Sequence, residues 1–240
     1  MPSELRNFFF KPQPFWEILP PAVWDALNAV SISQAYAKKT IIYSEGSHPR
    51  GLYIIRKGRL KVFIIDKNGS ELIIYFLGKD EFFGYRSIVC DENSPVYVET
   101  IEDCMVDCIP RRYFEHHLRE SPEMNAAFFY YLGHEFRLFV NKMSVFAQKP
   151  VSERVALALL VLDEKFRELP HATGVLNFTR ENLAAYIGTA PESLIRQLKV
   201  LKESGAITVK GRKIILEKPA VLWEKAGLSP GIDSGFQGIL

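Results

Sequence analysis

The spacing of apolar residues near the carboxyl end predicts two short helices separated by a tight turn. The first helix carries its apolar side chains on one face, at Leu183, Ala184 and Ile187. Gly188 follows, where a residue without a Cβ atom can adopt positive φ at no steric cost. The second helix carries an apolar stripe of Leu194, Leu198 and Leu201, and Gly205 ends it.

The start of the second helix and the residues after it complete the motif. Thr189 and Glu192 have the spacing of a capping box, and Pro191 suits a first helical turn. Two short β runs, 207–209 and 213–216, then flank a turn with charged residues at its tip. Helix, turn, helix and hairpin in this order predict a winged helix-turn-helix.

The front half has a different pattern, in which short β-rich runs alternate with turn residues. The predicted strands are 40–43, 52–55, 60–65, 72–76, 96–100 and 105–109. Turn signals separate them at intervals of about ten residues, and Asn68-Gly69 is the clearest hairpin turn. The pattern predicts an antiparallel, jelly-roll-like β-roll, that is, a double-stranded β-helix, and gives the whole chain an α+β fold.

A proline-free stretch after Pro122 predicts one long helix ending near Ala147, and a short helix over 113–119 precedes it. Its apolar residues recur every three or four positions, at Phe128, Leu132, Phe136, Phe139, Met143 and Phe146. This spacing is close to that of a coiled-coil seam and predicts a dimerisation helix. The alternative is an amphipathic helix that lies on the roll. Residues 149–152 then break the helix as a hinge, and Ser152 is expected to cap the next helix, 153–168.

Four segments follow from these patterns. They are a β-roll over 15–121, a dimerisation helix over 122–148, a winged helix over 152–227 and a disordered tail over 228–240. The chain has 240 residues, enough for two cores, and has neither an apolar run long enough to cross a membrane nor a signal core. Its cysteines, Cys90, Cys104 and Cys108, are too few for a disulfide framework. We therefore expect a cytoplasmic protein without a membrane partner.

Positive charge is concentrated in the predicted motif. Residues 178–218 contain eight Lys and Arg and four Glu, a formal charge of +4, whereas the whole chain carries +2. Double-stranded DNA is the partner that such a surface favours, because cationic side chains replace counterions at phosphates. The candidate DNA-binding residues are Arg180, Thr189, Glu192, Ser193, Arg196, Gln197, Lys199, Lys210, Arg212 and Lys213. The alternative is an ordinary helical domain with a solvated charged face.

The order of β-roll, long helix, hinge and winged helix resembles the CRP/FNR family of bacterial transcription regulators over about residues 15–227. The matching positions are Gly46, 52–55 with Lys57-Gly58, Gly69, Phe82-Phe83-Gly84, Ile109-Pro110, Phe114, Thr179-Arg180-Glu181, Ile187-Gly188, Glu192-Ser193 and 196–198. The resemblance implies a homodimer on a palindromic operator, an effector bound in the roll, and RNA polymerase as a candidate partner.

In this family the second helix commonly reads bases through an Arg at its opening, a Glu beside it and an Arg one turn later. Glu192, Ser193 and Arg196 match that pattern, whereas Pro191 stands where the first Arg often lies. The resemblance thus implies an operator that differs from those of the relatives. Glu192 has a competing role in the capping box.

The effector implied by the resemblance is not cyclic AMP. Members that bind cyclic AMP carry Gly-Glu-Leu followed by Arg-Ser or Arg-Thr, and here the corresponding stretches read Gly84-Tyr85-Arg86 and Ser94-Pro95. The candidate pocket residues are Gly84, Tyr85, Arg86, Ser87, Phe139 and Val140. The pocket either binds a small acidic or aromatic molecule or is filled by side chains, and Arg86 either binds an anion or forms a surface ion pair.

Other chemistries find little support in the sequence. An iron-sulfur cluster of the FNR type needs three cysteines near the N-terminus, but the first cysteine is Cys90. Cys104 and Cys108 share a strand face, and the sequence is compatible with two roles for them, structural thiols or a redox switch. A cupin-like enzyme needs clustered metal ligands, which His48, His116, His117, His134 and His171 do not provide. We expect no catalysis, metal or cofactor. A second alternative is a degenerate family member that acts as an interaction protein.

Overall fold

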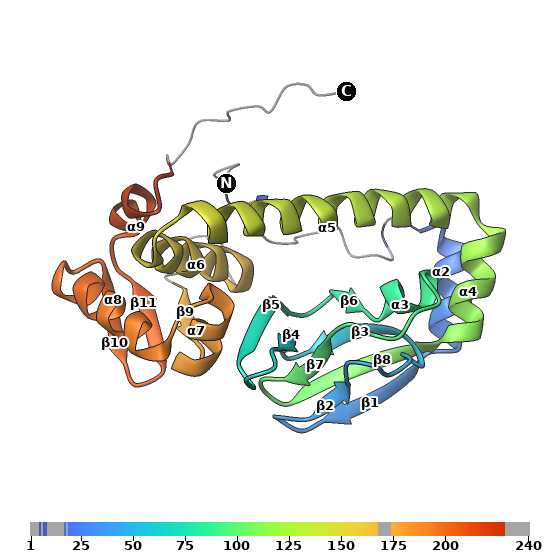
Figure 1. Ribbon diagram of the computed structural model, residues 1–240. Coiled ribbons are helices and arrows are strands. Elements are labelled where there is room, and N and C mark those ends of the chain that lie inside the picture. The colour runs from blue at the N-terminus through green and yellow to red at the C-terminus, as the bar shows by residue number, and fades with distance from the viewer. Residues whose placement is uncertain (1–4, 6, 9–16, 18, 168–173, 229–240) are drawn as a thin grey trace. The chain divides into compact units, whose positions relative to one another are not determined.

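The apolar runs of the front half form two four-stranded antiparallel sheets (Figure 1). The computed structural model describes residues 5, 7, 8, 17, 19–167 and 174–228. One sheet has the order β1 (Ile32–Tyr36), β8 (Cys104–Pro110), β3 (Gly51–Lys57) and β6 (Phe82–Phe83). The other has the order β2 (Ile41–Tyr43), β7 (Tyr97–Thr100), β4 (Leu60–Ile65) and β5 (Glu71–Leu77). The predicted β-roll is confirmed, and β1 and β6 are additional to the predicted strands.

Strand β3 is buried on both faces because it lies in a middle layer. Successive side chains of a strand point to opposite faces. Tyr53 and Ile55 join a core cluster with residues of β4, β5 and β7, whereas Leu52 and Ile54 are buried on the other face. Helices α3 (Tyr85–Val89) and α4 (Arg111–Glu120) contact β3, and α2 (Pro21–Ala29) contacts α4.

The long helix α5 (Pro122–Gln148) has nearly the predicted bounds. The described residues form two compact units, one made of those within 17–133 and one made of those within 134–228 together with residues 5, 7 and 8, so the division falls within α5. In the first unit Phe128 is only 3% exposed, and its ring centroid lies 5.1 Å from that of Phe114 and 5.6 Å from that of Tyr85. The prediction that Phe128 belongs to a dimer seam is therefore wrong, because this side chain fills the core of its own unit.

The second unit contains the predicted winged helix-turn-helix. Helix α6 (Val151–Phe166) precedes β9 (Val175–Asn177), α7 (Arg180–Ile187) and α8 (Pro191–Glu203). Strands β10 (Ile207–Lys210) and β11 (Lys213–Leu216) form the wing, and α9 (Pro219–Lys225) follows. Strand β9 pairs with β11 and completes a three-stranded antiparallel sheet. The predicted tail lies outside the described residues except for Leu228.

The segment predicted as a hinge is anchored within the second unit. The Lys149 ammonium lies 2.9 Å from a Glu153 carboxylate oxygen and donates to the Ala226 carbonyl at 2.8 Å. The Arg154 guanidinium donates to the carbonyls of Ile187 and Gly188, both at 3.0 Å. The prediction that Ser152 caps the next helix is wrong, because α6 begins at Val151, its N-cap is Pro150, and no side chain caps it.

Candidate nucleic-acid interface

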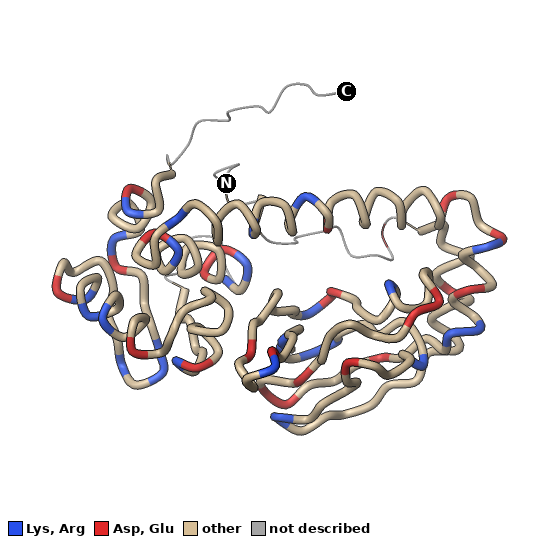
Figure 2. The backbone as a smooth tube through the Cα atoms, viewed as in Figure 1, with Lys and Arg blue, Asp and Glu red and all other residues tan. Residues whose placement is uncertain are grey.

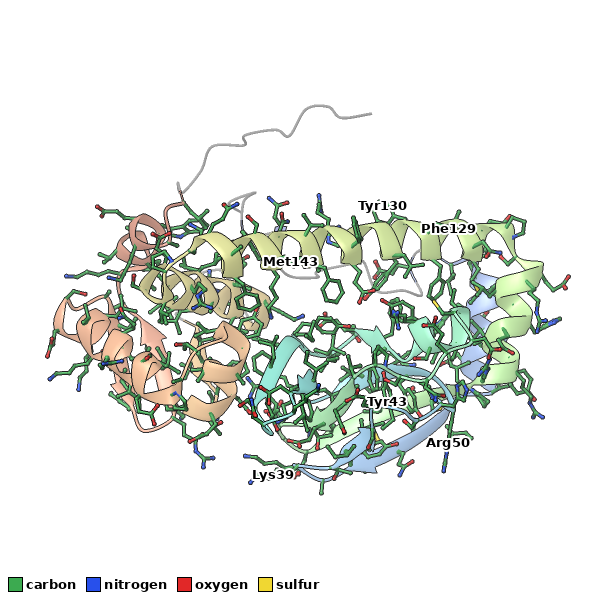
Figure 3. All side chains as sticks on the ribbon, viewed as in Figure 1. Lys39, Tyr43, Arg50, Phe129, Tyr130 and Met143 are labelled. Carbon is green, nitrogen blue, oxygen red and sulfur yellow. The ribbon has the colours of Figure 1, made fainter. Side chains whose placement is uncertain are left out.

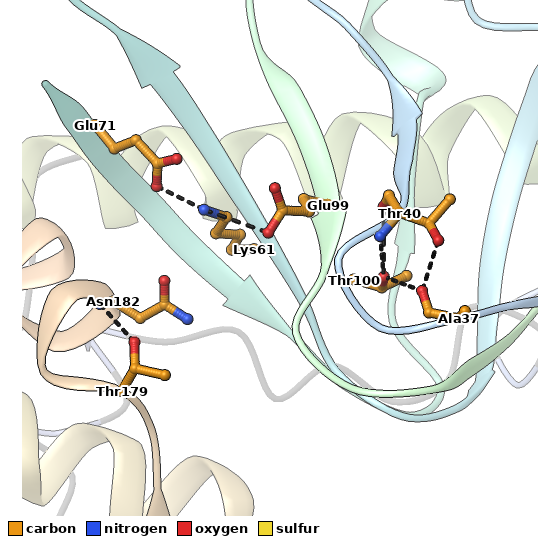
Figure 4. A network of polar contacts seen from close by, with 8 residues as sticks. All are labelled: Ala37, Thr40, Lys61, Glu71, Glu99, Thr100, Thr179 and Asn182. Atoms are coloured by element: carbon orange, nitrogen blue, oxygen red, sulfur yellow. Dashed lines mark hydrogen bonds and ion pairs between the residues drawn. The ribbon is translucent and has the colours of Figure 1, made fainter. Parts of the chain in front are cut away.

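Helix α7 begins and ends at sequence signals that fix its position. The Thr179 side chain caps the helix by accepting a hydrogen bond from the Asn182 amide at 3.1 Å (Figure 4). The helix ends at Gly188, whose φ of 69° lies in the left-handed region. A Cβ atom on Gly188 would lie 2.9 Å from the Phe146 ring, so glycine is also required by packing. Phe146, predicted in the dimer seam, thus packs within its own unit.

Helix α8 begins one residue later than the capping box predicted. Its N-cap is Ala190, whose side chain makes no capping hydrogen bond, and Pro191 is the first helical residue. Thr189 lies in the turn, where its amide donates to the Ala184 carbonyl at 3.0 Å. The capping role assigned to Thr189 and Glu192 is therefore wrong. Glu192 is exposed in the first turn of α8 and free of that competing role.

The outer face of α8 presents charged and polar groups. Glu192, Arg196 and Lys199 are exposed, whereas Leu194, Leu198 and Leu201 are buried against the domain. The Arg196 guanidinium donates to the Ser193 hydroxyl at 3.0 Å. Gln197, also predicted to contact DNA, is only partly exposed. Ile195 was not predicted, yet 52% of its surface is exposed beside Arg196.

The wing brings more positive charge beside α8. Lys210, Arg212 and Lys213 are all exposed at its tip, and Lys210 lies opposite Lys213 in the β10–β11 register. Figure 2 shows Lys and Arg on α8 and at the turn between β10 and β11. The Arg180 guanidinium donates to the Gly211 carbonyl at 2.9 Å. In the described structure Arg180 therefore holds the wing turn against the start of α7.

Three aromatic side chains pack together inside the β-roll, beside a mostly aliphatic core. The rings of Tyr53 and Phe83 stack with their centroids 5.0 Å apart, and the Tyr43 centroid lies 5.9 Å from each of them. Tyr53 and Phe83 are 5% and 3% exposed. Burial raises the pKa of Tyr53 to about 12, so its hydroxyl is neutral near pH 7. The cluster consists of packed rings at its centre, and the charge of Arg50 acts on the Tyr53 hydroxyl at its edge.

The predicted pocket residues are found in different environments. Tyr85 and Ser87 are 4% exposed, and Tyr85 packs edge-to-face on Phe82 with ring centroids 5.3 Å apart. Arg86 is exposed, and its guanidinium lies 3.6 Å from the Glu92 carboxylate, which is the surface ion pair given above as the alternative. Gly84, with φ of 91°, precedes α3. Phe139 and Val140 are on α5 in the other compact unit, 40% and 47% exposed.

The strand thiols are in surroundings that disfavour reaction. Burial raises the pKa of Cys104 to about 11 and also raises that of Cys108. The thiolate is the reactive form of cysteine, so both groups are poor nucleophiles near pH 7. Cys90 is exposed at the end of α3, and all three cysteines are free thiols.

Helix α5 exposes large apolar side chains that the predicted seam did not include (Figure 3). Phe129 and Tyr130 are 73% and 77% exposed, and Phe136 and Met143, which were predicted, are 71% and 70% exposed. Phe129, Phe136 and Met143 are seven residues apart, as are Gly133 and Val140. Leu132 is only partly exposed. An exposed heptad stripe therefore passes through positions 129, 133, 136, 140 and 143.

Sequence comparisons agree with both halves of this description. Residues 33–121 match the cyclic nucleotide-binding domain, and residues 153–225 match the Crp-like helix-turn-helix domain. The chain is 30% identical over 185 residues to the cAMP-activated global transcriptional regulator Vfr of Pseudomonas aeruginosa, covering 75% of this chain and 86% of Vfr. It is 26% identical over 190 residues to the fumarate and nitrate reduction regulatory protein of Vibrio cholerae, covering 78% and 76%. Among the described residues, no helix has the length and apolar character needed to cross a membrane.

Solved structures share the fold at lower sequence identity. FixK2 from Bradyrhizobium japonicum has a TM-score of 0.72 and 22% identity, covering 85% of this chain and 100% of FixK2. The c-di-GMP responsive regulator CLP of Xanthomonas campestris has a TM-score of 0.71 and 21% identity, covering 82% and 99%. The relatives are regulators rather than enzymes, and the similarity to Vfr extends through both domains. The chain therefore belongs to the CRP/FNR family of DNA-binding transcription regulators.

Proposed function

We propose that this protein is a homodimeric transcription regulator that binds a palindromic operator through α8 and the wing, under the control of a small molecule other than cyclic AMP. The observation that carries the proposal is the exposed face of α8, where Glu192, Arg196 and Lys199 lie opposite the buried leucine stripe. A helix of this kind fits the major groove of DNA, and the cationic wing beside it suits the phosphate backbone.

The two charged side chains at the start of α8 have complementary base preferences. Arg196 can donate two hydrogen bonds to guanine O6 and N7, and Glu192 can accept from cytosine N4. Pro191 occupies the first helical position and has no side-chain donor. The operator should therefore contain a G·C pair read by Arg196 and should lack the contact that relatives make through an opening Arg.

Dimerisation is proposed through the exposed heptad stripe of α5. Phe129, Phe136 and Met143 would pack into the facing helix of a second copy, as residues at one heptad position do in a coiled coil. A symmetric dimer presents two α8 helices to two half-sites, which lie about 34 Å apart when they are one helical turn apart. The palindromic operator follows from this symmetry.

The effector is proposed to differ from cyclic AMP because the groups that would bind a cyclic phosphate are buried, ion-paired or missing. Tyr85 is buried in an aromatic core, Arg86 is paired with Glu92, and Pro95 has no amide hydrogen to donate. Vfr is named as cAMP-activated and CLP as c-di-GMP responsive, so signals differ among the relatives. A second candidate is an effector-independent regulator, which the stacked rings of Tyr53 and Phe83 inside the roll favour.

Selection of DNA from a random library by the full-length protein tests DNA reading. We expect enrichment of an inverted repeat, and Arg196→Ala should weaken binding to it by about 1–3 kcal/mol while relaxing one position of each half-site. Lys213→Ala is the matched control, because removal of a phosphate contact lowers affinity for every sequence alike. Enrichment of no sequence, or an equal loss on all sequences with Arg196→Ala, would refute the proposal.

A thermal-shift screen tests the effector. Cyclic AMP should leave the melting temperature unchanged, whereas an effector that binds the folded state should raise it. A screen of acidic and aromatic metabolites without any hit would favour the effector-independent candidate. A cyclic AMP shift that is lost in Arg86→Ala would contradict the proposal.

A further inference from the structure

Ile195 is a large apolar side chain exposed on the helix that carries DNA recognition. It lies three residues after Glu192 and four before Lys199, and side chains at these spacings share one surface of a helix. The leucines of α8 are buried, and Leu198, three residues after Ile195, is its neighbour on the core side. Ile195 therefore lies on the edge of the face that would enter the major groove, next to Arg196.

The neighbours of Ile195 leave it uncovered for a reason visible in their contacts. Arg196, whose aliphatic stem could lie over it, instead directs its guanidinium to the Ser193 hydroxyl. The Lys199 ammonium lies 3.8 Å from the Glu203 carboxylate, one turn further along the helix. Both long side chains thus turn away, and 52% of the Ile195 surface remains exposed.

Isoleucine is suited to an apolar contact that must be made without much loss of entropy. A β-branched side chain in a helix has one strongly preferred χ1 rotamer, so its methyl groups are already fixed before binding. It can neither donate nor accept a hydrogen bond. Against a hydrogen-bond donor or acceptor on a base edge, it would displace water and leave that polar group without a hydrogen bond.

The major groove contains one apolar group on the base edges, the C5-methyl of thymine. We propose that Ile195 is a specificity-determining residue that selects thymine in each half-site by contact with this methyl group. Since Ile195 is adjacent to Arg196, the thymine lies within one or two base pairs of the guanine that Arg196 reads. The inference rests on the DNA reading proposed above and assigns one further base to it.

Uracil substitution isolates the methyl group, because uracil differs from thymine only at C5. Full-length protein is titrated by fluorescence anisotropy against the selected operator and against operators in which each symmetric thymine pair is replaced by uracil in turn. For one of these thymine pairs, the replacement should raise the Kd of the wild type about fourfold for each half-site, or about fifteenfold for both. This is the effect expected from losing one buried methyl-sized group in each half-site. Ile195→Ala should bind the thymine and uracil operators equally.

Val200→Ala is the matched control. Val200 is exposed to a similar extent, 48%, on the same helix, but it lies more than one turn further from the N-terminal end that contacts bases. It should keep the wild-type preference for thymine. Retention of the preference in Ile195→Ala, or equal wild-type affinity for every uracil operator, would overturn this inference alone. Failure to select any DNA sequence would overturn it together with the proposed DNA reading.

Discussion

Two phenylalanines on α5, Phe128 and Phe136, should respond in opposite ways to truncation. Phe128 is 3% exposed within its own unit, and Phe136 is 71% exposed on the heptad stripe. Phe128→Ala should lower the unfolding free energy of the subunit by about 3–5 kcal/mol, as loss of a core aromatic ring does. Phe136→Ala should leave subunit stability nearly unchanged. Burial of its exposed surface would contribute about 1.5–2 kcal/mol for each ring, or about 3–4 kcal/mol for a symmetric dimer. The dimer Kd should therefore rise about 10²- to 10³-fold.

Sedimentation equilibrium measures the dimer Kd, and urea unfolding at several protein concentrations separates subunit stability from association, because only the latter depends on concentration. Phe136→Leu is the matched control and should recover most of the affinity. An unchanged dimer Kd in Phe136→Ala would show that the exposed stripe of α5 is not the dimer seam. Dissociation by Phe128→Ala without loss of subunit stability would contradict the assignment of Phe128 to the core.

Three further predictions concern contacts in the C-terminal unit. Thr179→Ala removes the cap that accepts the Asn182 amide and should lower the unfolding free energy by about 1 kcal/mol, measured by urea unfolding, while Thr179→Ser should restore it. Arg180→Gln releases the Gly211 carbonyl, so the wing should become mobile and DNA affinity should fall on all sequences. Arg212→Ala should lower DNA affinity less in the Arg180→Gln variant than in the wild type. If fluorescence anisotropy shows that the two losses of affinity are fully additive, this coupling is refuted. Burial raises the pKa of Asp163 above 3.8, so the folded chain binds that proton more tightly than the unfolded chain does. The unfolding free energy of the wild type relative to Asp163→Asn should be greatest below pH 3.8 and should fall as the pH rises through the folded pKa of Asp163. A difference in unfolding free energy that stays constant with pH, measured by urea unfolding, would contradict this.

The periodic spacing of apolar residues in the sequence identified the helices and strands that bury only one face. The leucine stripe of α8 and the wing strands were predicted because each has one face on the core. Strand β1 was missed because its residues are mostly exposed, so its sequence lacks the alternation of a half-buried strand. Strand β6 has only two residues, Phe82 and Phe83, and this run is too short to show a periodic pattern.

The capping error has a local physical cause. Proline fixes φ at a value suited to the first helical position, and the residue before it is held extended. Pro191 therefore makes Ala190 the N-cap, with ψ of 145°, and leaves Thr189 one residue outside the helix. At α6 the proline is the N-cap itself: Pro150 is extended, with ψ of 161°, so the helix begins at Val151 and Ser152 is already its second residue.

Phe128 was wrongly placed in the predicted seam because α5 is apolar on more than one side. Four consecutive aromatic residues, 128–131, fit several helical stripes equally well. Only packing decides between them: Phe128 and Tyr131 are buried among the rings near α3 and α4, and Phe129 and Tyr130 are left exposed. Ile195 was likewise overlooked because a single apolar residue on a polar helix face carries no periodic signal.

The anchoring of Lys149 and Arg154 bears on the length of the operator. Lys149, directly after α5, donates to the Ala226 carbonyl, and Arg154 on α6 donates to the carbonyls of Ile187 and Gly188. In the proposed dimer, the two α8 helices are therefore not joined to α5 by flexible linkers, and we expect the distance between the two half-sites to be fixed. One inserted base pair between half-sites shifts one of them by about 3.4 Å and rotates it by about 35°. Target sites should therefore share a fixed spacing, which makes the gap between half-sites as useful in a genome search as their sequence.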